Sequence, residues 1–484
     1  MLVGFTALAL AALFPELAFA RPGGGDAFSG GSRGGGSGGG DGDIGLVIEL
    51  VILCVRYPPL GALVVGCLVV YWVVKRAKGS ALPEWSVGVP QNEIRQTRAS
   101  HVARSALDRV RANDPAFSIV LLEDFLYTLY AEVQVHRGGN QLARLAPYID
   151  ESVGRALFDP QLEAVFGVVV GAMRHVDFAM HPDRVELATE FEVNLSERRG
   201  GRETRLYVLD RVRFVRSIHA RSRPPARARK LDCPNCGAPL ESMRGTTCGY
   251  CQQHVGGGRL DWLVTRVDRL RTEPRGPLVT GEVHEQGNEL PTIVDPNAQR
   301  NLDAIRQKDP AFDHQALFAR TNLVFHELQI GWTARDLPRI RGYVTDNLFQ
   351  YFAYWIDVYT QARARNVTEN ARILNIELAN VLCDAYYDSV TLRVFATGLD
   401  YVVADDGKLL RGSKTRERPY SEYWTLVRGS ATRGKPRAEP ACPNCGAPLK
   451  VGMAGNCEYC HAKVVTGDFD WVLSRIEQDE AYGG

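Results

Sequence analysis

The sequence predicts an α+β protein in which two helix-on-antiparallel-sheet units follow a single-span membrane anchor, with a small metal module after each unit. Three observations predict this arrangement. The motif Asp-Pro-Ala-Phe occurs at residues 114–117 and again at 309–312. Segments rich in Val, Leu, Tyr and Phe, typical of strands, follow the helical pattern in both places. Eight of the 11 cysteines fall into two clusters with the same spacing.

Length and charge limit the alternatives. At roughly 100–200 residues per domain, a chain of 484 residues is expected to contain several domains. Lys and Arg number 57 against 56 Asp and Glu, which gives a net charge of +1. A partner selected by strong overall charge is therefore excluded, and any electrostatic function must be local.

The N-terminal end reads as a membrane-targeting region. Residues 1–20 are apolar and end in Ala-Phe-Ala, which predicts a signal peptide; an uncleaved anchor is the alternative. Residues 21–43 form a glycine-rich linker with too few apolar side chains to order itself. The membrane segment covers 44–74, and its span is placed at 57–74, about 27 Å of helix, which avoids burying Arg56. A soluble core helix at 60–74 is the other interpretation.

Charges beside the span predict the topology. Lys75, Arg76 and Lys78 begin a basic linker at 75–105 and favour a cytoplasmic location for everything after the span. That compartment is reducing, so clustered cysteines there more often hold metal than form disulfides. Cys54 and Cys67 lie in the membrane region, and Cys383 is expected to be a core residue.

The repeated motif predicts two equivalent units, at residues 106–218 and 300–430. At the same offset of 195, four further pairs of residues are identical: Leu122 and Leu317, Gln134 and Gln329, Leu142 and Leu337, Tyr148 and Tyr343. Each copy is expected to begin a helix with Asp114 or Asp309 as the cap and the following proline in the first turn. Four residues then form an apolar stripe that predicts a core face: Leu122, Leu126, Leu129 and Val133.

Strands are predicted after these helices in both units. In the second unit they are 373–383, 389–403 and 420–427, with a turn at 405–407. In the first unit, 184–195 and 205–216 surround Arg-Arg-Gly-Gly at 198–201, which predicts a hairpin. The segment 273–299 is read as the linker between the units.

The two cysteine clusters predict structural zinc sites in modules at 233–272 and 431–484. Both have the spacing C-x2-C-x11-C-x2-C. Their members are Cys233, Cys236, Cys248 and Cys251 in the first, and Cys442, Cys445, Cys457 and Cys460 in the second. Four thiolates satisfy tetrahedral Zn²⁺ and leave no open position for catalysis; a disulfide pair or free thiols are the alternatives. His254 and His461 are not equivalent under the repeat, so four-cysteine ligation is preferred.

A closing helix is expected at the end of each module. Asp261-Trp262 precedes Arg266, and Asp470-Trp471 precedes Arg475, a spacing that fits a short amphipathic helix. The tryptophans are interpreted as packing residues, with partner contact as the alternative.

The second unit resembles the C-terminal domain of the mitochondrial inner-membrane translocase subunit forty-four and its bacterial relatives, the Tim44-like family. Residues 309–312, 329–332, 336–337 and 423–428 carry the resemblance. The first unit is more divergent, because His-Arg at 136–137 stands in place of Gly-Trp at 331–332. The resemblance implies a cone-shaped fold of the nuclear-transport-factor-two type and a single-pass protein of the bacterial inner membrane. In mitochondria such a domain contacts the membrane peripherally and tethers a chaperone motor to a protein-conducting channel.

These features favour a non-enzymatic, membrane-anchored scaffold or adaptor that binds unidentified protein partners, such as translocation or membrane-protein assembly factors. The alternative is a carrier or enzyme that uses a hydrophobic pocket inside the cone. Its acid–base candidates are Tyr386, Tyr387 and Asp388, or His175 with Asp177. No catalytic residue and no small-molecule substrate are expected.

Local charge bears on two other partners, lipid and nucleic acid. The linker 219–232 and its flanks are basic, which fits either contact with anionic membrane lipid or a solvated linker. The basic residues are Arg216, Arg221, Arg223, Arg227, Arg229 and Lys230. Nucleic acid is not expected, because acidic residues flank the second cluster and would repel phosphate. These are Asp468, Asp470, Glu477 and Asp479.

Overall fold

The structure is a computed structural model that describes residues 103–274, 288, 290–479 and 482, all within one compact unit. We call residues 103–274 the first half and the described residues from 288 onward the second half. The predicted signal peptide, glycine-rich linker and membrane segment lie outside the described residues, as does most of the basic linker. Within the described ranges, no helix is both long enough and apolar enough to span a bilayer.

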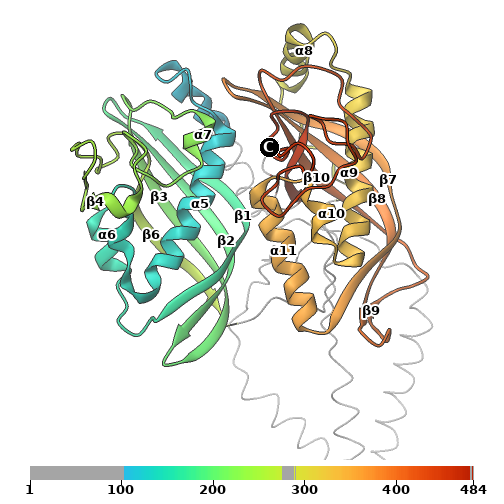
Figure 1. Ribbon diagram of the computed structural model, residues 1–484, viewed down its shortest axis with the longest axis horizontal. Helices are drawn as coiled ribbons and strands as arrows, with labels where there is room; N and C mark the ends of the chain where they lie inside the picture. Colours follow the sequence, from blue (N-terminus) through green and yellow to red (C-terminus); the bar gives the residue numbers. More distant parts are fainter. Residues whose placement is uncertain (1–102, 275–287, 289, 480–481, 483–484) are drawn as a thin grey trace, which may run out of the picture. The chain divides into compact units, whose positions relative to one another are not determined.

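The first half packs a long helix on an antiparallel sheet (Figure 1). The helix is α5 (Ile119–Arg137) and the strand order is β1-β2-β3-β6. The strands are β1 (Ala164–Met180), β2 (Arg184–Arg199), β3 (Arg202–Ser217) and β6 (Leu263–Glu273). The short elements are η1 (Leu107–Ala112), η2 (Gly138–Asn140), η3 (Leu142–Leu145), α6 (Glu151–Ala156), α7 (Pro225–Ala228), η4 (Leu240–Ser242), β4 (Met243–Arg244) and β5 (Thr247–Cys248).

The second half repeats this arrangement with longer helices (Figure 1). Its strand order is β11-β10-β8-β7, and the short strand β9 also pairs with β8. The strands are β7 (Ala364–Cys383), β8 (Tyr387–Ala404), β9 (Leu409–Gly412), β10 (Arg418–Gly429) and β11 (Val472–Gln478). The helices are α8 (Ala298–Lys308), α9 (His314–Ala334), α10 (Leu337–Arg341) and α11 (Asp346–Gln361). Helices on antiparallel sheets in both halves confirm the mixed helix-and-strand class.

The predicted core stripe and strands are confirmed. All four stripe residues of α5 are buried against the sheet, and Ser118 caps the helix by accepting a hydrogen bond from the Leu121 N–H at 3.2 Å. The five predicted strands are parts of β2, β3, β7, β8 and β10. The first hairpin turns at Gly200 and Gly201, whose positive φ values of 56° and 72° favour glycine. Strand β1 was not predicted, although its Val-rich sequence is typical of a strand.

The helix caps predicted at Asp114 and Asp309 are wrong. Ser118 and Asp313 occupy the cap positions instead. Asp114 is buried and accepts a hydrogen bond from Arg216 at 2.6 Å, and Asp309 accepts one from Arg428 at 2.9 Å. The physical reason is that a buried arginine needs an opposite charge, which outweighs a cap that a neighbouring residue can provide.

The closing helices predicted after the clusters are also wrong, because both segments are strands. Strand β6 pairs with β3, and β11 pairs with β10, so each metal module lies between the last two strands of a sheet. The β-branched residues suit a pleated strand, and β3 and β10 offer backbone groups for pairing. Trp262 and Trp471 are buried in the cores, which confirms that they are packing residues.

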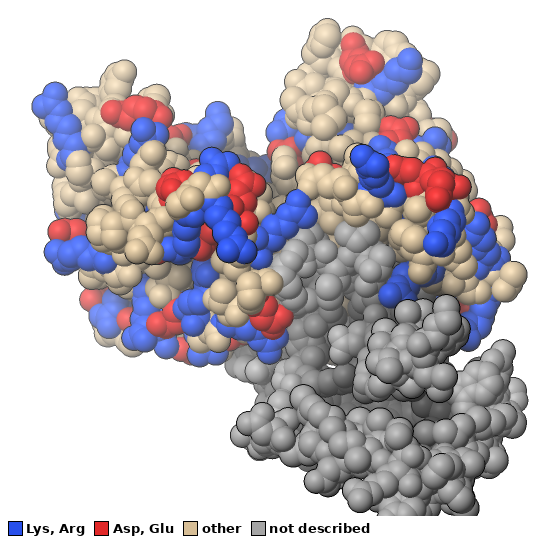
Figure 2. Space-filling view, turned by 90° about the horizontal axis from the view of Figure 1, so that it is seen from below, with Lys and Arg blue, Asp and Glu red and all other residues tan. Residues whose placement is uncertain are grey.

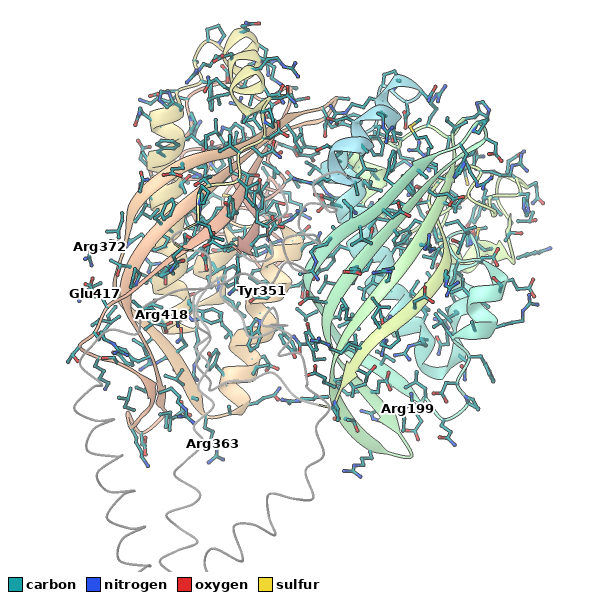
Figure 3. All side chains as sticks on the ribbon, turned by 180° about the vertical axis from the view of Figure 1, so that it is seen from behind. Arg199, Tyr351, Arg363, Arg372, Glu417 and Arg418 are labelled. Atoms are coloured by element: carbon teal, nitrogen blue, oxygen red, sulfur yellow. The ribbon has the colours of Figure 1, made fainter. Side chains whose placement is uncertain are left out.

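The edge of the second sheet opposite β11, which is strand β7, is irregular. Strand β7 pairs with β8 through three register shifts. Beside them, Arg372 Nη1 forms an ion pair with Glu417 Oε1 at 2.8 Å, and Figure 3 shows the two side chains together at this side of the sheet. Bulges and charges at a terminal strand disfavour edge-to-edge pairing with another chain.

Candidate metal centres and the cleft between the halves

The eight predicted cysteines come together in two groups of four, and local backbone geometry explains how. In the first turn of each module, the N–H of Gly237 or Gly446 donates to the carbonyl of the leading cysteine at 2.8 and 2.9 Å. Both glycines have positive φ, 81° and 76°. This geometry turns the two sulfurs of one Cys-x2-Cys pair toward the same side.

The sulfur positions fit tetrahedral metal. Within each group the four Sγ atoms all lie within 4.8 Å of one another. Three of the distances are 3.9 Å (Cys233 to Cys251), 3.7 Å (Cys236 to Cys248) and 3.8 Å (Cys442 to Cys460). A tetrahedron with metal–sulfur bonds of about 2.3 Å has edges of about 3.8 Å. Each group can therefore bind one metal ion, and neither group includes a histidine.

Hydrogen bonds favour the thiolate form at three of these positions, since they lower the pKa of Cys248, Cys251 and Cys460. Backbone N–H groups, first that of Cys251, lower the pKa of Cys248 to about 6. The Asn444 side chain donates to the Cys460 sulfur at 3.4 Å and is the main cause that lowers the pKa of that thiol to about 6. Burial raises the pKa of Cys233 to about 12, and a coordinated cation is what deprotonates such a thiol.

Each module is joined to its half by the same buried contact. The Arg216 guanidinium, held by Asp114, lies over the Trp262 ring with its carbon 5.9 Å from the centroid. The corresponding distance from Arg428 to the Trp471 ring is 4.9 Å. Because each tryptophan directly precedes the last strand, this Asp–Arg–Trp contact fixes the position at which the chain returns from the module to the sheet.

The second module also contacts the helices of its half. Lys463 Nζ donates to Asp346 at 2.8 Å, and Arg341 forms an ion pair with the same carboxylate. Arg341 Nε donates in addition to the Met453 carbonyl at 2.9 Å. The loops that carry the second cluster are therefore held against α10 and the start of α11.

Most arginines of the predicted basic linker are used inside the fold. Arg216 and Arg223 are buried, and Arg223 pairs with Asp232 at 2.8 Å and with Asp261 at 2.6 Å. Arg229 Nε pairs with Asp124 at 2.8 Å. Arg227 donates to the Cys233 carbonyl at 3.2 Å. Arg221 and Lys230 remain exposed, so a lipid contact by the whole cluster would require these ion pairs to open.

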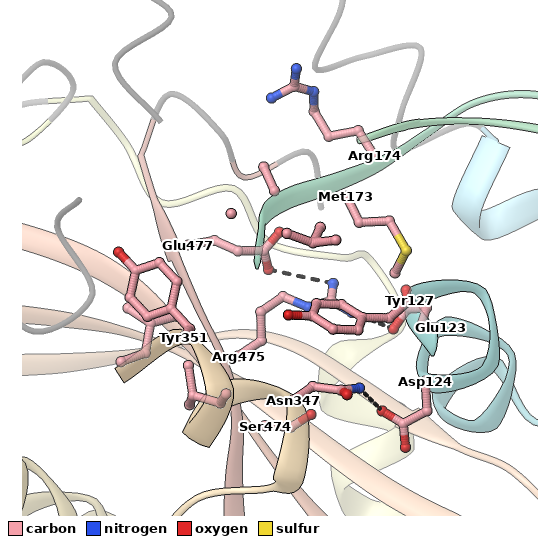
Figure 4. A pocket seen from close by; sticks show the side chains of 15 residues that line it. Glu123, Asp124, Tyr127, Met173, Arg174, Asn347, Tyr351, Ser474, Arg475 and Glu477 are labelled. Atoms are coloured by element: carbon pink, nitrogen blue, oxygen red, sulfur yellow. Dashed lines mark hydrogen bonds and ion pairs between the residues drawn. The ribbon is translucent and has the colours of Figure 1, made fainter. Parts of the chain in front are cut away.

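A cleft of about 90 Å³ lies between the halves, lined by α5 and β1 on one side and by α11 and β11 on the other (Figure 4). Glu123 on α5 forms ion pairs with Arg104, at 3.1 Å, and with Arg475 on β11. Asn347 donates to Asp124 at 2.9 Å. Tyr351 lines the cleft from α11, which contacts β1 (Figure 3). The sequence pattern gave no signal for this cluster, because its members are far apart in the chain.

Burial and charge control the ionisation of this cluster. Burial alone would raise the pKa of Glu123, but Arg104 and Arg475 beside it hold that pKa well below its usual range. Burial raises the pKa of Asp124, and Arg229 only partly opposes the effect. Burial also lowers the pKa of His175, against the opposing effect of Glu123.

The candidate acid–base residues are not brought together as the carrier or enzyme alternative requires. His175 is buried, with Nδ1 3.0 Å from Thr189 Oγ1 and Nε2 3.6 Å from Glu123. Asp177 is exposed on the same strand. Asp388 is buried and forms an ion pair with Lys308, and Tyr387 lies beneath the Arg229 guanidinium. These contacts are structural.

The fold and the centres together define a class: a two-part α+β protein with a candidate four-cysteine metal module within each sheet connection. Residues 298–437 match the Tim44-like domain, so a domain of this type is found in the second half. The match ends before the second cluster and does not include β11.

No curated protein sequence matches the chain. Among solved structures, a protein described as an Ntf2-like protein involved in plasmid conjugation aligns with 70% of this chain and 87% of its own, at 7% identity and a TM-score of 0.16. The cone shape implied by the sequence resemblance stays a prediction.

Proposed function

We propose that the protein is a non-enzymatic scaffold or adaptor, anchored in the bacterial inner membrane by the predicted span and exposing its described halves to the cytoplasm. The Tim44-like match at 298–437 carries this proposal. The proposed partners are unidentified proteins and membrane lipid. We further propose that the first half is a divergent second copy of the domain and that both centres hold structural Zn²⁺.

The packing of the second half supports a scaffold over a carrier. Between its helices and sheet, where a ligand cavity would lie, Trp332, Phe352 and Trp424 are buried in one continuous core. The Trp332 indole donates to Asn366 at 2.6 Å, and its ring meets Phe352 edge-on at 5.9 Å. Large aromatic side chains occupy this space, and a hydrophobic ligand would have to displace them.

The surface charges fit a protein partner better than nucleic acid. On the face seen from below, positive and negative side chains are interspersed over both halves (Figure 2). Nucleic-acid affinity depends on neutralising many phosphates with a concentrated basic surface. A mixed surface of this kind is compatible with solvent and with selective protein contact.

The test is site-specific photocrosslinking of the full-length chain in native membranes. A photoreactive residue replaces Leu374, which is 59% exposed on β7 of the Tim44-like half, and in a matched variant Leu270, which is 46% exposed on β6. We expect discrete protein adducts from position 374 that are absent or different from position 270. A carrier would instead give no protein adduct at either position, together with a small molecule that remains bound to the purified chain in native mass spectrometry.

A further inference from the structure

We propose that the metal ion of the second centre controls the cleft between the halves: it holds β11 in the sheet, and β11 holds the Glu123 cluster closed. This inference rests on the proposed metal occupancy. It goes further because it gives the second centre a role in the contact between the halves, which the first centre does not have.

The first step is that β11 depends on its module. It pairs on one side with β10, from Glu422 with Gln478 to Val427 with Val472, and it is the terminal strand of its sheet. The chain enters it through residues 461–471, which follow Cys460, the last cysteine of the second cluster. In the cluster around the four cysteines, the buried apolar residues other than cysteine are Val451, Val464 and Val465. A core this small orders itself only with a metal ion or a similar crosslink.

The second step is that two polar contacts across the cleft adjoin positions held by the module. Arg475, in the middle of β11, forms the ion pair with Glu123. Asn347, which donates to Asp124, directly follows Asp346, the carboxylate that binds Lys463 of the module. If the module loosens, the Lys463–Asp346 bond and the strand that carries Arg475 loosen together.

The third step is that the contact is local. An apolar contact elsewhere joins the halves, with Val120 and Leu121 of the first half against Tyr387 on β8 of the second. Arg111 Nη1 also donates to the Cys383 carbonyl on β7 at 3.0 Å, and neither Tyr387 nor Cys383 pairs with β11. Loss of the second metal should therefore open the cleft at Glu123 without separating the halves. Glu123 is 7% exposed in the closed arrangement, so its accessibility reports the opening directly.

The first centre provides a matched control. Strand β6 is the counterpart of β11, and its Arg266, at the position corresponding to Arg475, is exposed and pairs with Asp268 in the same strand. Loss of the first metal should disturb β6 and leave Glu123 protected. The two centres share ligands and spacing. Comparing them therefore separates the proposed control of the cleft by the second centre from a general effect of metal loss.

The experiment compares Cys460→Ser with Cys251→Ser in the full-length protein, since each removes the last cysteine of one cluster. Carboxylates are labelled with a carbodiimide and an amine, and labelling at Glu123 is read by mass spectrometry against the buried Asp388 on β8 as reference. We expect a severalfold rise at Glu123 in Cys460→Ser, no change in Cys251→Ser, and one metal ion fewer in each. Equal labelling at Glu123 in the two variants would overturn the proposal that the second metal ion keeps the cleft closed.

A third variant and a second readout keep the outcomes distinct. Arg475→Gln should expose Glu123 with both metal ions retained. If it does not, β11 does not close the cleft. Hydrogen exchange must show that β7 and β8 keep their protection in Cys460→Ser, because loss throughout the sheet would make the centre a general stabiliser. A wild-type protein without metal would refute the proposed occupancy itself, whatever Arg475→Gln shows.

Discussion

The two halves share a frame but use its last strand differently. In both, a parallel contact joins the last strand to the segment after the long helix: Val264 N–H donates to the Tyr148 carbonyl at 2.8 Å, and Leu473 N–H donates to the Tyr343 carbonyl at 3.0 Å. In the first half the arginines of this strand pair within that half, Arg266 with Asp268 and Arg269 with Asp210. In the second it supplies Arg475 to the other half. The same framework can therefore serve as a surface or as an interface after a few side-chain changes.

The residue that pairs with Arg475 also differs between the two halves. Glu123, which receives Arg475, has Phe318 at the repeat-related position of α9. Phe318 is half-buried and packs against its own core and the His314 ring. The acidic residue is present only in the half where a cation from the other half meets it. This ion pair is thus one place where the halves differ both in sequence and in contacts.

The largest expected effect tests what the halves share, their metal centres. Cys457→Ser and Cys248→Ser should each lower the metal content from about two ions per chain to about one. Each should also remove exchange protection from its own module, since structural Zn²⁺ contributes roughly 10–16 kcal/mol in small zinc modules. Metal analysis with hydrogen exchange checks this. Wild-type protein with native thiols intact and almost no metal would contradict it.

Next in size are the buried arginines. Arg428→Met and Arg216→Met each leave an aspartate uncompensated, at side-chain exposures of 2% for both Asp309 and Asp114. Removing one partner of a buried ion pair costs about 3–5 kcal/mol. Each variant should lower the stability of its own half in urea. Hydrogen exchange measures this loss in β8 for Arg428→Met and in β2 for Arg216→Met. Adding Asp309→Leu to Arg428→Met should recover part of the loss, and no recovery would mean that the ion pair is not the cause.

Local patterns determined most of what the sequence could predict. The strands of both hairpins and the stripe on α5 follow from alternation and helical spacing, which neighbouring residues set. The eight cysteines were predictable because both ligand pairs of each centre lie within one short segment.

What the sequence could not show depends on distant partners. Asp114 looked like a cap because its partner, Arg216, is far along the chain. The segments after the tryptophans looked helical because Trp262 and Arg266 have helical spacing, and only pairing with β3 makes that segment a strand. Glu123 had no motif, because its environment is assembled from both halves.

A smaller effect tests the difference between the halves directly. Arg475→Met should cost about 1–3 kcal/mol, because Glu123 is buried and loses a charged hydrogen-bond donor while retaining Arg104. Arg266→Met, at the corresponding and exposed position, should change stability by about 0.5 kcal/mol or less. Urea denaturation of the two variants measures the contrast. Equal costs would show that the ion pair across the cleft has no special weight.

The smallest expected effect is a pH dependence confined to the first half. Burial lowers the pKa of His175 below the usual value, so the unfolded state takes up a proton that the native state does not. Stability should therefore fall as pH drops below about 6.5, the ordinary histidine pKa. Glu123 has a lowered pKa, so its contribution is present above the ordinary glutamate pKa of about 4.3 and is lost only at lower pH. The two groups thus act in separate pH ranges.

The second half should not show the loss of stability below about pH 6.5 that we expect in the first half. The three register shifts of β1 with β2 and of β7 with β8 have the same spacing, and they place Leu378 at the position that His175 has in β1. Hydrogen exchange measured between pH 7.5 and 5.5, corrected for the intrinsic exchange rate, should show opening of β1 and β2 increasing as pH falls, with β7 and β8 unaffected. His175→Gln should flatten the response of β1 and β2. If the increase in exchange at low pH persists in this variant, another group causes the pH dependence. An equal increase in β7 and β8 would remove the distinction between the halves.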